Sequence, residues 1–371
     1  MLSNALFPAR LIFPVRSSLC LARTSGTIQL GNSDSAIGFA QSASSHQLGP
    51  TMRIAALIHN PDSGGSRKRR RELQSALAVL EGAGVEADLI AAESAEFAEE
   101  ATRRAVAAGC DTVFACGGDG TVHNIAQVLA QTPVALAILP MGTANALAHD
   151  LGIPNNVTKA ARAALHYAPR RVALGRVEYA DLKGNPDSRY FVVAAGIGVD
   201  AHLFYKLHGA AKQRMGMAAY YAKAWNLWFS YPMTQFVAEY LENGTREPKQ
   251  VDVTELMSVR IGNFGGVLQE LAPGASLDRN DLRLVFCRTA SRAAYLAYVT
   301  RGLLGQTWKI PGIDLVDSKC VSSRYKESSS ESKASNGQRK IYIEADGELL
   351  GTLPMTMTVV PDALTLLGPP R

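Results

Sequence analysis

Residues 116–121, with the sequence CGGDGT, constrain the fold of this chain more than any other stretch. The apolar residues 112–115 before them are typical of a short buried strand, and apolar positions at helical spacing over 122–129 indicate a helix after them. A glycine-rich turn between a strand and a helix leaves backbone N–H groups pointing outward at the positive end of the helix dipole, where phosphate binds favourably. The stretch therefore predicts a phosphate-binding turn within an α/β architecture.

Asp119 is the unusual member of this turn. A carboxylate repels phosphates unless a metal ion lies between them, so its presence indicates nucleotide phosphates held together with Mg²⁺. The alternative is a structural turn in which Asp119 or Thr121 caps the helix. The turn is not a Walker loop, because no Gly-Lys-Ser/Thr follows, and the G-x-G-x-x-G spacing of dinucleotide-binding proteins is absent.

Strands and helices are predicted to alternate from residue 54 to residue 151. The predicted strands are 54–58, 85–90, 112–115 and 134–139, and the predicted helices are 66–80, 93–108, 122–129 and 144–151. This alternation is typical of an α/β domain with an open parallel sheet covered by helices. Because the carboxyl ends of parallel strands meet at one edge, the loops after three of these strands should line one crevice.

The pattern changes near residue 169, where short strand-like runs begin to dominate. These runs are 170–180, 190–195, 235–241, 251–262, 282–288, 339–345, 355–360 and 363–367, and they predict a mostly antiparallel, β-rich second domain. The aromatic-rich interval 203–229 predicts an amphipathic helix, which either packs in the core or forms a lid that faces a membrane.

We therefore expect three parts. Residues 1–51 form a disordered tail, or result from a start codon assigned upstream of Met52; residues 52–168 form a nucleotide-binding α/β domain; residues 169–371 form a β-rich substrate domain. Within the last, the Ser-, Lys- and Glu-rich stretch 322–339 is expected to be a disordered surface loop, because it can bury little apolar surface.

Composition limits the partners of the chain. The net charge of +5 suits anionic partners, yet basic residues are not interleaved with aromatic ones in a nucleic-acid-binding pattern, so we expect no nucleic acid. Five scattered cysteines suggest reduced thiols in the cytoplasm. The longest apolar run, 134–148, is interrupted by Pro140 and Gly142, so any membrane contact should be peripheral.

Three motifs in order carry a resemblance to a known family. Residues 117–121 resemble the GGDGT signature shared by diacylglycerol kinases, sphingosine kinases, NAD kinases and ATP-dependent phosphofructokinases. Residues 140–145, PMGTAN, are similar to the P-x-G-T-x-N motif of the diacylglycerol kinase catalytic-domain family, and residues 60–65, NPDSGG, are similar to its first nucleotide loop. The chain thus resembles a bacterial-type diacylglycerol or sphingosine lipid kinase, with a first domain like that of phosphofructokinases and NAD kinases.

The resemblance implies an ATP- and Mg²⁺-dependent kinase that phosphorylates a lipid hydroxyl, of diacylglycerol or a sphingoid base, in the cleft between the domains. It also implies a D-G-E motif at 346–348, with Glu348 as general base and Asp346 as an orienting or metal-linked neighbour, and it makes Asp119 the metal ligand. The residues implied in ATP binding are Asn60, Ser63, Gly64, Gly117, Gly118, Asp119, Gly120, Thr121, Gly142, Thr143 and Asn145. The resemblance further implies a cytoplasmic protein that contacts anionic membranes peripherally. It does not decide whether the protein forms a homodimer.

The chain departs from the family pattern in several places. Ala146 and Ala173 stand where acids of the Mg²⁺ network are usual, and His123 and Asn124 stand where Asn and Glu are usual. A secondary metal motif, usually L-D-D-G, reads LDRN at 277–280, so we expect no metal there.

Two other functions stay open. A kinase for a soluble acceptor, as in NAD kinases, is opposed by the P-x-G-T-x-N motif. A non-catalytic nucleotide- or lipid-binding protein is favoured by the two alanines and opposed by Glu348, because a binding protein needs no base.

Overall fold

The computed structural model describes residues 52–61, 67–199, 232–265, 270–306, 308–326 and 340–370. The expected tail, the aromatic-rich interval 203–229 and the loop residues 327–339 lie outside the described residues. Ser63 and Gly64 of the first nucleotide loop also lie outside them. Among the described residues, no helix combines the length and the apolar character that crossing a bilayer requires.

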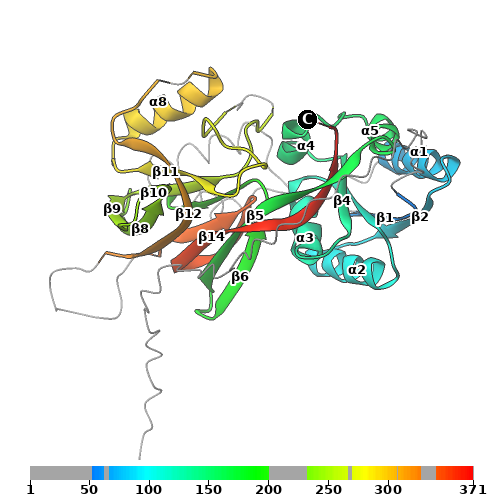
Figure 1. Ribbon diagram of the computed structural model, residues 1–371, viewed down its shortest axis with the longest axis horizontal. Coiled ribbons are helices and arrows are strands. Elements are labelled where there is room, and N and C mark those ends of the chain that lie inside the picture. Colours follow the sequence, from blue (N-terminus) through cyan, green and yellow to red (C-terminus); the bar gives the residue numbers. More distant parts are fainter. Residues whose placement is uncertain are drawn as a thin grey trace, which may run out of the picture. The chain divides into compact units, whose positions relative to one another are not determined.

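The first half of the chain builds a parallel sheet with helices on both faces (Figure 1). Its strands, in the order β2-β1-β3-β4, are β1 (Ile54–His59), β2 (Glu86–Ala91), β3 (Thr112–Gly117) and β4 (Ala135–Pro140). The helices are α1 (Arg67–Gly82), α2 (Ala95–Ala107), α3 (Asp119–Leu129), α4 (Ala146–Asp150) and α5 (Val157–Ala164). Helix α1 packs beside α5 and α2 packs beside α3. The α/β architecture predicted from the alternating pattern is therefore present.

One long strand, β14 (Glu348–Gly368), joins this sheet to the second half of the chain. Its end pairs parallel to β4, with Thr365 opposite Ala135, and most of its length pairs antiparallel to β5 (Ala168–Asp181). Figure 1 shows β14 and β5 running together from one half to the other. The parallel sheet of the α/β half therefore does not end at β4, because it continues through β14 into the β-rich half.

The β-rich half is built on a closed circuit of strand pairs. The pairings run β14–β13–β7–β10–β11–β12 and return from β12 to β14, all antiparallel. The strands not yet given are β6 (Pro186–Phe191), β7 (Ala194–Ile197), β8 (Phe236–Glu242), β9 (Lys249–Val253), β10 (Glu255–Val259), β11 (Leu282–Cys287), β12 (Ile313–Tyr325) and β13 (Tyr342–Ala345). Helix α8 (Arg292–Leu303) places Tyr295 and Tyr298 in a small core with Val285 and Cys287 of β11.

Several predicted boundaries are wrong. Residues 322–325 belong to β12 and not to a disordered loop, because they pair with β8 and Ser322 and Ser323 pair also with β14. The runs 355–360 and 363–367 are one strand, β14, with an irregularity between Val360 and Leu364. The run 251–262 contains two strands, β9 and β10, and the helices α5 and α8 were not predicted.

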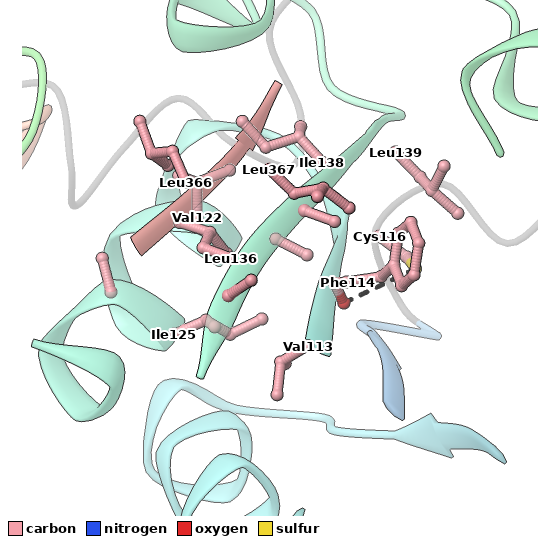
Figure 2. Close-up of a cluster of buried hydrophobic side chains, with 14 of the residues drawn as sticks. Val113, Phe114, Cys116, Val122, Ile125, Leu136, Ile138, Leu139, Leu366 and Leu367 are labelled. Carbon is pink, nitrogen blue, oxygen red and sulfur yellow. Dashed lines mark hydrogen bonds between the residues drawn. The ribbon is translucent and has the colours of Figure 1, made fainter. Parts of the chain in front are cut away.

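The core of the α/β half includes the end of the chain. Figure 2 shows Phe114 and Leu136 from β3 and β4 beside Ile125 of α3, with Leu366 and Leu367 of β14 among them. All of these side chains are buried. The hydrophobic packing under the 116–121 turn therefore depends on residues more than two hundred positions further along the chain.

A glycine on β14 tests this arrangement. A Cβ atom on Gly351 would lie 2.0 Å from the carbonyl oxygen of Ala180 on β5, so the backbone of one strand would have to move. We expect Gly351→Ala to lower the free energy of unfolding by roughly 1–3 kcal/mol, as overpacking does, measured by urea denaturation. Gly368→Ala is the matched control, because its Cβ would lie at an ordinary 3.8 Å from Leu151. Equal losses in the two variants would contradict this account of β14.

Candidate active site

A cavity of about 500 Å³ opens where the carboxyl ends of β1, β3 and β4 meet. The loop after each of these strands contributes to its wall. The lining residues include His59, Asn60, Arg69, Ser94, Ala98, Gly118, Gly120, Thr121, Asn124, Met141, Gly142, Thr143 and Glu348. The three loops predicted to share one crevice are therefore together, and Glu348 of the distant D-G-E turn lines the same cavity.

Three of the residues expected to bind the nucleotide do not line this cavity. Gly117 is buried at the end of β3, where a Cβ would lie 2.2 Å from Oγ1 of Thr121. Asn145 lines a neighbouring cavity of about 490 Å³, together with Lys68 and His149. Asp119 is absent from the lining of both. The cavity that Asn145 lines shares Arg69, Met141, Gly142 and Thr143 with the first one, so the two cavities adjoin.

The two glycine loops touch through their backbones. A Cβ on Gly142 would lie 2.4 Å from Cα of Gly118, and a Cβ on Gly118 would lie 3.1 Å from Cα of Gly142. The side chain of Asn145 closes the second loop: its Oδ1 accepts from N of Gly142 at 2.8 Å and its Nδ2 donates to O of Gly142 at 3.0 Å. The close approach of the loops thus requires glycine at position 142 and leaves little room for a side chain at position 118.

The Asp119 carboxylate fastens the first loop to the second. It accepts hydrogen bonds from N of Asn145 at 3.0 Å and from N of Ala146 at 2.7 Å, at the start of α4. Helix α3 has Gly118 as its N-cap and no side-chain cap, so the alternative in which Asp119 or Thr121 caps its own helix is wrong. Burial raises the pKa of Asp119, the negative charge of Asp346 adds to this, and the two backbone N–H groups oppose it.

The D-G-E turn is held by Asp346, whose side chain is only 3% exposed. Its carboxylate accepts from the backbone N–H groups of Val192 at 2.9 Å, Val193 at 2.8 Å and Ala194 at 3.1 Å. The residue has φ +49, an uncommon value outside glycine. These bonds fix the turn that joins β13 to β14, and so fix the position from which Glu348 extends.

His123 on α3 supports the same carboxylate, with its Nδ1 3.1 Å from Oδ2 of Asp346. Gln127, one turn further on, is oriented by a pair of hydrogen bonds to N and O of Tyr190, both 2.9 Å, and its Nε2 lies 3.4 Å from Nε2 of His123. The two ring nitrogens thus face the Asp346 carboxylate on one side and the Gln127 amide on the other. Sequence reasoning noted His123 as unusual but missed this pair, because 223 positions separate the two residues.

Glu348 lies directly over the first glycine loop. Its Oε1 is 3.2 Å from the position that a Cβ on Gly120 would take. It is the one carboxylate among the described residues that line the cavity, where Arg69 supplies a positive charge. Burial, with the positive charge of Arg70, lowers the pKa of His59, so that ring is neutral at pH 7. The cavity therefore combines backbone N–H donors and a cation with a single carboxylate that can accept a proton.

Two models of known protein families match the two halves of this chain. The model of the diacylglycerol kinase catalytic domain matches residues 54–177, and the model of the YegS C-terminal NAD kinase beta sandwich-like domain matches residues 192–368. The two models together account for most of the chain and place the D-G-E turn in the second match.

Individual relatives match over almost their whole length. A diacylglycerol kinase of Bacillus subtilis (strain 168) is 29% identical over 306 residues, which are 82% of this chain and 92% of the relative. A diacylglycerol kinase of Staphylococcus aureus (strain bovine RF122 / ET3-1) is 26% identical over 302 residues, 81% of this chain and 87% of the relative. A crystal structure of a diacylglycerol kinase from Bacillus anthracis str. Sterne has the same fold, with a TM-score of 0.61, 18% identity and coverage of 86% and 97% of the two chains. The chain belongs to the diacylglycerol kinase catalytic-domain family, a family of kinases.

Proposed function

We propose that this protein is an ATP- and Mg²⁺-dependent lipid kinase that phosphorylates the hydroxyl of diacylglycerol or of a sphingoid base. The observation that carries the proposal is the position of Glu348, a carboxylate from the β-rich half that lines the same cavity as the two glycine loops. Such a cavity offers phosphate-binding groups and a base within reach of each other. We also propose that the protein is cytoplasmic and contacts anionic membranes peripherally, and that the boundary between its two domains lies near residue 168.

The glycine loops suit the phosphates of ATP. The backbone N–H group of Gly120 lies in the first turn of α3, where the helix dipole favours negative charge, whereas that of Thr121 donates to the carbonyl oxygen of Gly118 at 3.0 Å. Gly142 and Thr143, in the loop that touches the first one at Gly118, line the same cavity, as do Asn60 and Arg69. Ser63 and Gly64, outside the described residues, belong to the same proposed nucleotide loop. Gly117 and Asn145, also expected to bind ATP, would serve by holding the loops.

The residues around Asp119 fit a Mg²⁺ ion bound mainly by phosphate and water. Each oxygen of Asp119 accepts one backbone N–H and keeps a further lone pair, and a divalent cation would offset the burial and the Asp346 charge that raise its pKa. No three His, Cys, Asp or Glu side chains gather into a metal site among the described residues. Mg²⁺ in nucleotide sites is generally held by one or two carboxylates together with phosphate and water, so Asp119 is the carboxylate proposed for it here. When bound, Mg²⁺ would neutralise charge on the transferring phosphoryl group.

Glu348 would act as the general base. A lipid hydroxyl is a weak nucleophile at neutral pH, and it gains reactivity when a carboxylate accepts its proton as the oxygen attacks. The hydroxyl oxygen then bonds to the γ-phosphorus, the bond from that phosphorus to the β,γ-bridging oxygen breaks, and ADP leaves. Gly120 would leave room for the Glu348 carboxylate above the loop.

The alanine at position 146 does not weigh strongly toward a non-catalytic binding protein. Its backbone N–H, and not its side chain, makes the contact with Asp119, so the loop keeps its connection without an acid at this position. A soluble acceptor such as NAD stays the second candidate, since the described cavity does not distinguish acceptor classes.

The direct test incubates the purified full-length protein with labelled ATP, MgCl₂ and separate acceptors: diacylglycerol and a sphingoid base in mixed micelles, and NAD in solution. We expect label in the phosphorylated lipid, resolved by thin-layer chromatography. Labelled NADP would instead support the soluble-acceptor kinase. Absence of product with every acceptor, while ATP still binds, would support the binding protein.

Glu348→Gln tests the base. The amide keeps the size and the hydrogen bonds of the side chain but accepts a proton poorly, so we expect kcat for the lipid to fall by roughly 10²–10⁴-fold. The KM for ATP should change little, because the glycine loops are intact. Glu86→Gln on the edge strand β2 is the control and should keep full activity. Loss of ATP binding in Glu348→Gln would mean that the residue has a structural role.

Gly142→Ala tests the contact between the two glycine loops. The added methyl would force the backbones of Gly118 and Gly142 apart, so ATP affinity, measured by calorimetry, should fall by roughly ten- to a hundredfold. Gly82→Ala is the matched control, because no atom lies within 4 Å of its Cβ position. Unchanged affinity in Gly142→Ala would show that ATP binds away from this contact.

A further inference from the structure

Arg260, directly after β10, is an arginine buried to 1% exposure. Its Nη2 donates to the carbonyl oxygens of Ala173 at 3.0 Å and Arg279 at 2.9 Å, with that of Leu277 at 3.5 Å, and its Nη1 donates to the carbonyl oxygen of Asp281. Among the described residues, its Nε has no hydrogen-bond partner. The buried charge is thus met by backbone carbonyls and not by a directly bonded carboxylate.

Three of these carbonyls come from alternate residues of one loop, Leu277, Arg279 and Asp281. Carbonyl oxygens that converge from a single loop are ligands that hard cations such as Ca²⁺ and Mg²⁺ use in proteins. Here the guanidinium fills that position and satisfies the oxygens with its N–H groups. Burial lowers the pKa of Arg260 to about 10, so the group still carries its charge at neutral pH.

The acids around the loop are paired with arginines or an amide. Arg279 binds the Asp281 carboxylate through Nε at 2.7 Å and Nη2 at 2.8 Å, and its Nη2 also lies 2.9 Å from Oδ2 of Asp317. Nη1 of Arg283 donates to Oδ1 of Asp317 at 2.9 Å, and Nδ2 of Asn243 donates to Oδ2 of Asp281 at 2.7 Å. The position where the family motif has a second acid is Arg279 itself. The side chains present therefore do not suit a metal ion.

We infer that residues 277–281 form a cation-binding loop whose cation is the protein's own Arg260 guanidinium, so that the loop needs no metal ion. Arg260 supplies the charge at the centre, and Arg279 replaces the acid that a metal would require. The inference does not depend on the proposed kinase reaction.

The segment that follows Arg260 is hydrogen-bonded to helix α4, which borders the candidate active site. Two and three residues after Arg260, the N–H groups of Gly262 and Asn263 donate to Oδ1 of Asp150 at 2.9 and 3.0 Å. Asp150 is the last residue of α4, whose first N–H binds Asp119. A guanidinium that cannot dissociate keeps this connection independent of the concentration of divalent cations.

The first test uses the full-length protein without nucleotide. After dialysis against EDTA and then buffer, elemental analysis should find no divalent metal at one per chain, and Tm should be the same in EDTA, MgCl₂ and CaCl₂. A stoichiometric ion that is also retained by Asp119→Asn, which lacks the proposed catalytic ligand, would overturn the inference.

The second test converts the loop. Arg260→Met should lower Tm by roughly 5–10 °C whatever the metal concentration, since it leaves buried carbonyls unpaired, whereas Arg288→Met at an exposed ion pair should change Tm little. The double variant Arg260→Ala/Arg279→Asp opens the position and restores the acid, so its Tm should rise saturably with CaCl₂ or MgCl₂. Absence of that rise, with wild-type protein as reference, would contradict a cation-binding loop.

Discussion

The bonds of the buried Asp346 carboxylate determine the geometry of the site. Three successive backbone N–H groups, from Val192 to Ala194, and the ring of His123 surround it. Hydrogen bonds to a charged acceptor are roughly twice as strong as neutral ones, so this set can hold a residue at φ +49 that would otherwise be strained. Without the carboxylate, three buried donors would lose their acceptor, and the turn that carries Glu348 would no longer be tied to α3.

The pairing of β14 links the position of Glu348 to the hydrophobic core of the α/β half. Because one strand contributes both Glu348 at its start and Leu366 and Leu367 at its end, the proposed base and the core under the glycine turn belong to one continuous element. A hinge between the α/β half and the β-rich half would have to bend β14 and β5 together.

Local pattern predicted much of the α/β half and of the cavity. The strand, glycine turn and helix around residue 118 are encoded by neighbours in sequence, and three loops after parallel strands had to meet at one edge. Contacts between distant residues could not be predicted in this way. The backbone contact of Gly118 with Gly142 and the pairing of His123 with Asp346 depend on how elements pack, and a single sequence carries no signal of them.

The missed elements differ in this respect. Helix α5 does carry local signals, because its buried residues Val157, Ala160, Ala161 and Ala164 recur at helical spacing and Asn156 caps it through N of Lys159, but it is only eight residues long. In β14 the sequence around Asp362 suggests a turn, with φ +47 there, yet pairing with β5 continues on both sides of the irregularity. Tertiary pairing overrides the local preference in such a strand.

Asp119, Asp346 and Glu348 are all carboxylates, but their surroundings differ, and this difference supports the roles proposed for them. Asp346 has its oxygens surrounded by backbone donors, and protonating it would cost those bonds. Asp119 likewise accepts two N–H groups, which connect the glycine loops. Of these three carboxylates, Glu348 alone lines the cavity, and no described residue donates a hydrogen bond to its side chain. A general base must exchange a proton without losing structural contacts, so of the two acids in the D-G-E turn it is Glu348, and not Asp346, that is suited to this reaction.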